Sequence, residues 1–244
     1  ATRLAAQGYD LILCDISPDR LEAVAAPLRA DGVVVELLAC NIAELTFPDN
    51  LIACLGDRPI GAVVHTAGLS PTMGDADLIF SVNYDATARL VHAIRPRMQA
   101  GSCAVLISSS SGYSAASPQV DALLDAVPLD GDSTSLRPGV THPGHAYSLT
   151  KRGVHKIVER QATGFGERGA RIMSVSPGLI DTSMGRAEAE AHPSMAKMLE
   201  RTPLGRYGTG DEIASVAVFL CSSDASYVTG SDIKVDGGVL ATGS

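Results

Sequence analysis

The sequence is poor in aromatic residues and contains no run of basic residues. Phe, Trp and Tyr make up 4% of its 244 residues, and the net charge is −8 with a pI of about 5.2. A nucleic-acid platform needs a positive surface and stacking side chains, so both absences argue against one. No apolar run reaches membrane-spanning length, and no signal-peptide pattern is present. These absences predict a cytoplasmic protein that binds neither nucleic acid nor membrane.

Closely spaced cysteine pairs are also absent. The five cysteines are scattered, and each sits in or beside an apolar run, which favours reduced thiols in a core. A structural zinc site would need close pairs of cysteines. His142 and His145 have the spacing of a ligand pair, but Pro143 and Gly144 between them indicate a loop turn instead. We therefore predict no metal site.

Short apolar runs alternate with helical patterns along the chain. The runs are continuous, as in strands of a parallel sheet that is covered on both faces. We expect an α/β fold with a doubly wound parallel sheet in a single Rossmann-like domain. The predicted strands are 10–14, 33–39, 62–65, 104–108, 171–175 and 232–235, and the longer predicted helices are 18–30, 78–99, 147–166 and 211–221.

Polar and glycine-rich residues follow several of these strands. Asp15 follows the first, TAG at 66–68 the third, a run of serines at 108–111 the fourth, and SPG at 176–178 the strand at 171–175. In a doubly wound sheet, ligands bind at the carboxyl ends of the strands. A small residue lets the backbone approach a ligand, and a carboxylate can bind a ribose. These strand ends therefore predict a nucleotide site.

Tyr147 and Lys151 stand four residues apart and face the same way if this stretch is helical. Such a pair is common on solvated helix surfaces, so the rest of the chain has to decide whether it is functional. The sequence resembles the short-chain dehydrogenase/reductase family over nearly its whole length. The resemblance rests on the order and spacing of Asp15, TAG at 66–68, Asn83 in SVNYDA, ISS at 107–109, YSLTK at 147–151, SPG at 176–178 and the closing LGRYG…VAVFL…ASYVTGSDIKVDGG.

This resemblance implies a catalytic mechanism. Tyr147 would act as general acid or base on the reacting oxygen, and the Lys151 ammonium would favour the tyrosinate and hydrogen-bond the nicotinamide ribose. Ser109 would hydrogen-bond the substrate oxygen. Asn83 would hold a water that passes protons from Lys151 to solvent, unless it only satisfies a helix bend as a buried amide.

The resemblance also implies how the cofactor is held. Asp15 would accept hydrogen bonds from both ribose hydroxyls of NAD and repel the 2′-phosphate of NADP. Ile16 follows it, rather than an arginine that would neutralise that phosphate, so NAD is favoured over NADP. Asn41 replaces the family's aspartate near adenine, and its amide oxygen can still accept a hydrogen bond. The other predicted cofactor contacts are Tyr147, Lys151, Ile42, Ala67, Gly68, Pro177, Gly178, Ile180 and Thr182.

One part of the family pattern is not found. The family's glycine-rich phosphate loop lies after its first strand, and the opening stretch ATRLAAQGYD is similar to the back half of the helix that follows that loop. We therefore expect one N-terminally truncated domain, 1–244, whose sheet lacks its first strand. The pyrophosphate would then lack its cradle of backbone N–H groups.

A long insertion separates the serine from the tyrosine. Ser109 and Tyr147 are 38 positions apart (147 − 109), far more than is usual in the family. The extra segment, about 113–145, contains the helix candidate VDALLDAV and is expected to overhang the substrate pocket, or else to be a surface excursion. Bacterial 3α-hydroxysteroid dehydrogenase/carbonyl reductases resemble the sequence in this respect, which suggests a hydroxysteroid or another bulky apolar carbonyl compound. The segment 182–202 is expected to be a second cover.

The predicted function is the interconversion of a secondary alcohol and a ketone, with a small molecule as substrate. A sugar-nucleotide epimerase or dehydratase would share the Tyr–Lys pair but would need a separate C-terminal substrate domain. A non-catalytic nucleotide sensor or scaffold would be favoured by loss of the catalytic residues, and all are present. The family forms dimers and tetramers through its long helices and its last strand. Because the insertion can cover the helix pair, we predict a homodimer rather than a homotetramer.

Overall fold

The computed structural model describes residues 1–242, which form a single α/β domain around a parallel sheet. Four strands pair in the order β3 (Ala62–His65), β4 (Cys103–Ile107), β5 (Arg171–Pro177) and β8 (Asp232–Val235). Strands β1 (Leu11–Asp15) and β2 (Val35–Ala39) pair with each other, as do the two-residue strands β6 (Ile180–Asp181) and β7 (Gly208–Thr209). Within the described residues, no hydrogen-bonded ladder joins β1 to β3, so the main sheet is in two parts.

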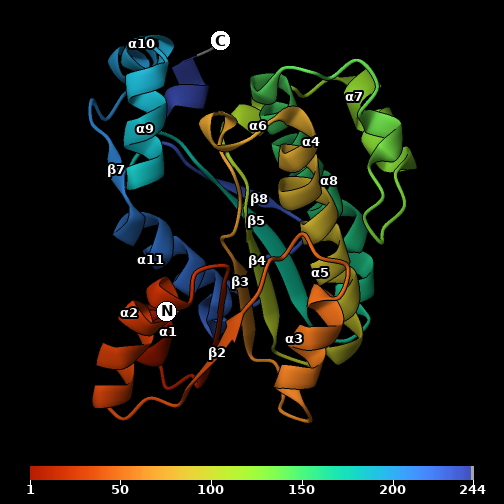
Figure 1. The fold of residues 1–244 in the computed structure, drawn as a ribbon, viewed down its shortest axis with the longest axis vertical. Coiled ribbons are helices and arrows are strands. Elements are labelled where there is room, and N and C mark those ends of the chain that lie inside the picture. The colour runs from red at the N-terminus through yellow and green to blue at the C-terminus, as the bar shows by residue number, and fades with distance from the viewer. Residues whose placement is uncertain (243–244) are drawn as a thin grey trace.

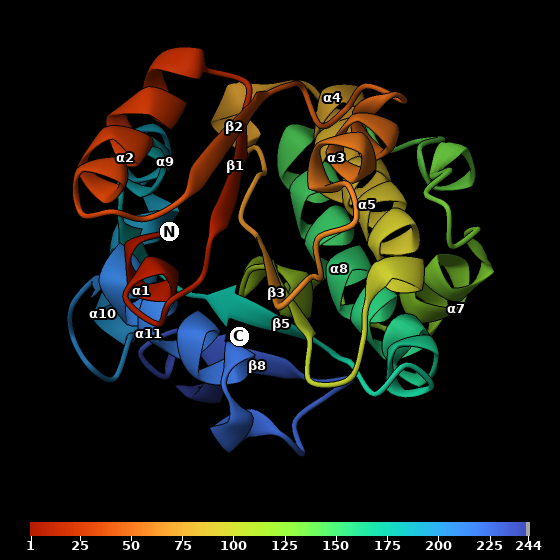
Figure 2. The same ribbon diagram turned by 90° about the horizontal axis from the view of Figure 1, so that it is seen from below.

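Helices cover both faces of this sheet. Helices α5 (Ala86–Ile94) and α8 (Pro143–Gly166) lie on one side, and α11 (Gly210–Cys221) lies on the other with the short α1 (Thr2–Ala5) (Figure 2). Helix α2 (Pro18–Ala30) packs on β1 and β2, and α3 (Phe47–Leu55) packs on α5. None of the helices in residues 1–242 is both long and apolar enough to cross a membrane.

The burial of strand β4 shows why its sequence is a continuous apolar run. Ala104 and Leu106 point into the core cluster beneath α5 and α8, whereas Cys103 and Val105 point into the cluster beneath α11. Successive side chains of a strand point to opposite faces, so a strand with a core on each side needs apolar residues at every position. This arrangement confirms the predicted doubly wound sheet.

Two predicted helices differ from those in the structure. The long helix expected at 78–99 is divided into α4 (Ala76–Ile79), a π-helical turn (Phe80–Asp85), α5 and a 3₁₀ turn. Helix α8 begins at Pro143 rather than at Tyr147, and the His142 Nδ1 accepts the Gly144 N–H (3.1 Å) as its N-cap. The Pro-Gly pair is therefore a helix start and not a loop turn, because proline lacks an N–H that the first turn does not need.

The insertion begins within the short α6 (Ser111–Ser114) and contains α7 (Pro118–Ala126), which packs against the outer flank of α8 (Figure 1). Leu124 of α7 is fully buried in the main core cluster. Asp121 forms two hydrogen bonds with Arg152 of α8 (2.7 and 2.6 Å), and Arg160 donates to the backbone oxygen of Val127 (2.8 Å).

A second anchor joins the rest of the insertion to the π-helical turn. The Asp85 carboxylate accepts the Ser133 N–H (3.0 Å) and forms an ion pair with Arg137 (2.6 Å). The insertion therefore covers the flank of α8 and the π-helical turn, and its expected overhang of the substrate pocket stays a prediction. The segment 182–202 reaches the catalytic end and folds into α9 (Ser183–Ala191) and α10 (Ser194–Arg201).

Candidate active site

The predicted catalytic residues come together at the carboxyl ends of β3 and β4. Ser109 follows β4, Tyr147 and Lys151 lie on successive turns of α8, and Asn83 lies in the π-helical turn. The Lys151 Nζ donates to the backbone oxygen of Ile107, the last residue of β4 (3.0 Å), and lies 5.7 Å from the centre of the Tyr147 ring. The pair that the sequence places on one helix face is thus fixed against the strand end that carries Ser109.

Gly68 brings the end of β3 into the same site. A Cβ atom at this position would lie 3.3 Å from the Asn83 Oδ1 and 3.4 Å from the Lys151 Nζ. The backbone after β3 therefore passes between the amide and the ammonium, and any side chain would crowd both. This close approach gives the predicted TAG motif a physical reason.

Ser109 is the serine that reaches Tyr147. Its hydroxyl oxygen accepts the Ser111 N–H (3.2 Å), and its hydrogen bond with the phenol partly offsets the rise in the pKa of Tyr147 that burial causes. Ser108 instead donates to the backbone oxygen of Lys151 (2.8 Å), and the Ser110 N–H donates to the backbone oxygen of Pro177 (2.9 Å). Ser108 and Ser110 thus have structural hydrogen bonds of their own.

Burial dominates the acid–base behaviour of the catalytic pair. Burial raises the pKa of Tyr147 above its usual value, and Ser109 only partly offsets this. Burial also lowers the pKa of Lys151 to about 8. The net rise in the pKa of Tyr147 reflects desolvation of the phenolate, and the expectation that Lys151 favours the tyrosinate stays a prediction. At neutral pH the phenol is protonated and suited to donate a proton.

The side chain of Asn83 is used by the backbone of Leu69. Its Oδ1 accepts the Leu69 N–H (2.7 Å), and its Nδ2 donates to the Leu69 oxygen (2.9 Å). The backbone oxygen of Asn83 accepts the Thr87 hydroxyl (2.9 Å), which in turn contacts His65 Nε2 (2.9 Å). Asn83 is therefore a buried amide within a π-helical turn, a feature often found at functional sites. Its role in holding a water stays a prediction.

Asp15 lies at the carboxyl end of β1, where a ribose was predicted to bind. Its Oδ1 accepts the Ser17 N–H (2.8 Å) and forms an ion pair with Arg20 (2.8 Å), and 37% of its side chain is exposed. Sequence reasoning considered Ile16 and missed Arg20. The missed signal is the Ser17-Pro18 helix start, which places the third residue of α2 beside the strand end.

The remaining predicted cofactor residues lie at or near strand ends. Asn41 Oδ1 accepts the Ala43 N–H (3.0 Å), so its amide oxygen closes a turn, and the Thr182 hydroxyl accepts the Gly185 N–H (3.0 Å) as the N-cap of α9. A Cβ at Gly178 would lie 2.7 Å from the Cα of Asp236. Contact with a cofactor stays a prediction for all of these residues, which are Asn41, Ile42, Ala67, Gly68, Pro177, Gly178, Ile180 and Thr182.

The donor and acceptor set fits the two riboses of a dinucleotide. Lys151 uses one of its three N–H donors on Ile107, which leaves two for hydroxyl groups. Asp15 uses Oδ1 in its hydrogen bonds, and in residues 1–242 its Oδ2 has no protein partner. Lys151 would therefore hold the ribose near Tyr147, and Asp15 would hold the other.

A buried polar network supports the site from behind and was not predicted. Asp232 of β8 accepts the Tyr113 hydroxyl (2.9 Å) and the Ser174 hydroxyl (2.6 Å). His155, one turn after Lys151 on α8, contacts the Ser176 hydroxyl (2.9 Å) and lies 3.5 Å from Asp232. The network ties α6, which follows Ser109, and α8 to strands β5 and β8.

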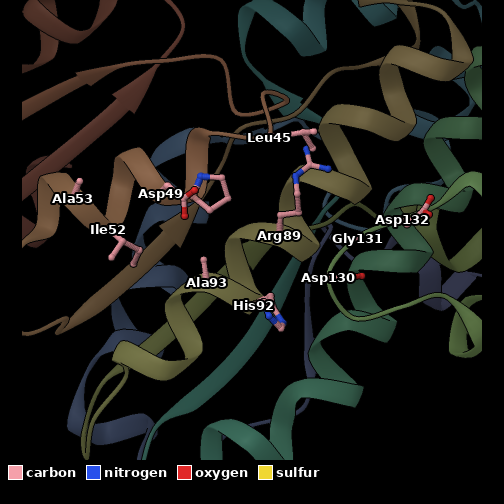
Figure 3. Close-up of a pocket in the computed structure, with 11 residues that line it drawn as sticks. Leu45, Asp49, Ile52, Ala53, Arg89, His92, Ala93, Asp130, Gly131 and Asp132 are labelled. Atoms are coloured by element: carbon pink, nitrogen blue, oxygen red, sulfur yellow. The ribbon is translucent and has the colours of Figure 1, made fainter.

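A cavity of about 830 Å³ lies away from these residues, between α3, α5 and the insertion (Figure 3). Arg89 and His92 project into it from α5, and it shares no residue with the predicted site. Asp49, Asp130 and Asp132 add three carboxylates to its wall.

Comparison with known proteins identifies the family of this chain. Residues 1–124 and 132–240 match the model of a family described as enoyl-(acyl carrier protein) reductase. The chain is 31% identical to short-chain dehydrogenase/reductase bsc3 of Alternaria brassicicola, over 98% of this chain and 90% of that protein. The chain belongs to the short-chain dehydrogenase/reductase family. It is therefore an oxidoreductase of a family that uses a nicotinamide cofactor.

Two further relatives show how far the likeness extends within the family. The 3-alpha-hydroxysteroid dehydrogenase/carbonyl reductase of Comamonas testosteroni is 31% identical, over 90% of this chain and 87% of that protein. The crystal structure of a short-chain dehydrogenase/reductase, glucose/ribitol dehydrogenase, from Brucella melitensis is 27% identical. It superposes with a TM-score of 0.76 over 97% of this chain and 88% of that one.

Proposed function

We propose that this protein is an NAD-dependent oxidoreductase that interconverts a secondary alcohol and a bulky apolar ketone, such as a hydroxysteroid and its oxo form. The observation that carries the proposal is the convergence of Ser109, Tyr147 and Lys151 at one buried strand end. The hydroxysteroid dehydrogenase relative supports the substrate class, and the carboxylate of Asp15 supports NAD.

The chain's own residues supply the proton chemistry. In the reductive direction, the protonated Tyr147 gives its proton to the ketone oxygen while Ser109 donates a hydrogen bond to the same oxygen. Lys151 keeps a positive charge beside the phenolate that forms, which stabilises it. The nicotinamide cofactor, when bound, supplies the hydride to the carbonyl carbon. In the oxidative direction the same proton returns to Tyr147 from the alcohol.

The proposal is tested with Tyr147→Phe, which removes the proton donor and keeps the ring. We expect turnover of a hydroxysteroid with NAD to fall by about 100-fold to 10,000-fold, the usual worth of a general acid. NADH binding, measured by fluorescence, should change little, because the phenol oxygen does not anchor the cofactor.

Tyr227→Phe is the matched control, because Tyr227 is fully exposed and should leave turnover unchanged. The assay includes a panel of secondary alcohols and ketones of increasing size. Comparable turnover by Tyr147→Phe and the parent protein would remove the catalytic assignment, and a preference for small polar alcohols would remove the substrate class.

A further inference from the structure

The short helix α6 lies between the catalytic serine and the rest of the insertion. Its first residue, Ser111, donates its backbone N–H to the hydroxyl oxygen of Ser109 (3.2 Å). A hydroxyl group has one hydrogen and two lone pairs, so an N–H that occupies one lone pair limits where the hydrogen can point. The orientation of α6 therefore determines how Ser109 presents its hydroxyl group to a substrate oxygen.

Two backbone contacts hold α6 but do not fix its rotation. The Ser110 N–H, just before the helix, donates to the backbone oxygen of Pro177 (2.9 Å). Gly112 lies directly on α8, because a Cβ atom there would come within 2.9 Å of the backbone carbon of Lys151. Within residues 1–242, no residue of α6 belongs to a core cluster of apolar side chains. Two points define an axis, and a four-residue helix without an apolar anchor can turn about it.

Tyr113 supplies the third point of attachment. Its hydroxyl donates to the Asp232 Oδ2 of β8 (2.9 Å), across 119 positions of the chain. The Lys234 ammonium lies 4.4 Å from the centre of the Tyr113 ring, and the His155 ring is 4.9 Å away between centres. Both contacts keep the ring in place, and the hydrogen bond ties α6 to the sheet.

Asp232 is a firm acceptor for this hydrogen bond. Only 9% of its side chain is exposed, and its Oδ1 accepts the hydroxyl of Ser174 (2.6 Å), a fully buried residue of β5. Hydrogen bonds to a charged group are stronger than those between neutral groups, and a buried carboxylate that loses a donor is costly. The carboxylate is therefore fixed by the sheet, independently of α6.

We propose that Tyr113 is a positioning residue, which orients Ser109 toward the reacting oxygen by fixing α6 to β8. The inference rests on the proposed alcohol–ketone function and adds to it a residue that acts through Ser109 alone. It also explains how a long insertion can follow so closely after the serine. The anchor lies between the two, so movement of the insertion is not passed on to Ser109.

Tyr113→Phe tests the anchor, because it removes the hydroxyl and keeps the ring. The kcat for ketone reduction should fall about tenfold, since a donor that is present but misaligned loses part of the roughly 100-fold that it is worth. NADH binding, measured by fluorescence, should not change. Ser174→Ala is the matched control, because it removes the other hydroxyl from the same carboxylate and leaves α6 attached. Its kcat should stay within about twofold of the parent value.

A double-mutant cycle separates positioning from a general loss of stability. Ser109→Ala should lower kcat about 100-fold. Adding Tyr113→Phe to it should lower kcat by less than about twofold more, because no hydroxyl is left to orient. A tenfold fall in both backgrounds overturns the proposal, as does an unchanged kcat in Tyr113→Phe alone. If circular dichroism shows that Tyr113→Phe is unfolded, Tyr113→Phe with Asp232→Asn replaces it, because this pair leaves no buried carboxylate short of a donor.

A second measurement needs no substrate. Hydrogen exchange of the Ser111 N–H, followed by NMR, reports directly on the bond to Ser109. Exchange should be at least about tenfold faster in Tyr113→Phe and unchanged in Ser174→Ala. If the parent protein reduces no secondary ketone, the proposed function fails, and the exchange rate then decides the role of Tyr113 alone. Unchanged exchange in Tyr113→Phe overturns that role.

Discussion

The two parts of the sheet hold their functional residues in different ways. Strands β4 and β5 are buried along almost their whole length and have a core cluster on each face. Strands β1 and β2 are mostly half-buried and share one small cluster with α2. The catalytic residues lie at the carboxyl end of the first part, and Asp15 is the last residue of β1 in the second.

The more buried part of the sheet carries the catalytic residues, and the less buried part carries the residue that is predicted to choose the cofactor. The ammonium of Lys151 is held by the end of β4, and the buried side chain of Asn83 is held by the backbone of Leu69. In contrast, the Asp15 carboxylate is held by a short turn and by Arg20, most of whose side chain is exposed. We expect changes in the first part to alter folding, assembly and turnover, and changes in the second to alter which cofactor is preferred.

The largest expected effect comes from removing the insertion, which covers the catalytic part only. Without residues 117–141, the flank of α8 and the π-helical turn become exposed, and we expect a homodimer to become a homotetramer. The deletion also carries Asp85→Ala, because Asp85 loses both of its partners. Light scattering gives the mass, and circular dichroism shows whether the variant is folded.

The parent dimer would then form through the face of α11 and β8, which remains uncovered. Phe219 on α11 is half-exposed and Tyr227 is fully exposed. Phe219→Glu should therefore convert the parent protein to a monomer. In a two-fold interface the substitution occurs in both subunits, so two buried carboxylates would face the same interface. A tetrameric parent protein would contradict the idea that the insertion blocks the helix pair.

The features that the sequence predicted are those set by local patterns. Continuous apolar runs identified the buried strands, and the four-residue spacing of Tyr147 and Lys151 identified their common helix face. The polar residues at the strand ends follow from the geometry of a parallel sheet, in which all carboxyl ends meet at one edge.

The features that the sequence did not predict depend on contacts between distant segments. Tyr113 and Asp232 are 119 positions apart, and Asp85 and Arg137 are 52 apart. Composition gave no reason to place the insertion on the flank of α8, because an amphipathic helix fits any apolar surface. The raised pKa of Tyr147 likewise reflects burial, which the Tyr–Lys spacing does not reveal.

An intermediate effect should appear on acidification, through His65 at the end of β3. Burial, with a smaller contribution from Lys151, lowers the pKa of His65 to about 4. Between that value and the ordinary pKa of about 6.5, the unfolded chain binds more protons, so the free energy of unfolding falls as the pH falls. The shift sets an upper limit of roughly 3 kcal/mol for this loss.

His65→Gln should weaken this acid dependence, because glutamine can still donate to Thr87 and does not titrate. Urea unfolding at pH 7 and at pH 5 measures the difference, with His92→Gln as control because His92 is exposed on α5. Equal acid dependence in the parent protein and His65→Gln would show that the catalytic part is not the source of the sensitivity.

The smallest effect belongs to the nucleotide part and concerns preference rather than stability. Asp15→Ala removes a ribose acceptor and the repulsion of a 2′-phosphate, so the ratio of kcat/KM for NAD to that for NADP should fall about tenfold, or about 1.4 kcal/mol. Arg20→Ala should raise the ratio, because the carboxylate then has no counter-charge.

Asp19→Ala, on the exposed side of α2, is the control and should leave the ratio unchanged. All three should alter the free energy of unfolding by less than about 1 kcal/mol, because exposed ion pairs contribute little. If Asp15→Ala left the ratio unchanged, the carboxylate would not contact the ribose, and the cofactor choice would have to come from Arg20.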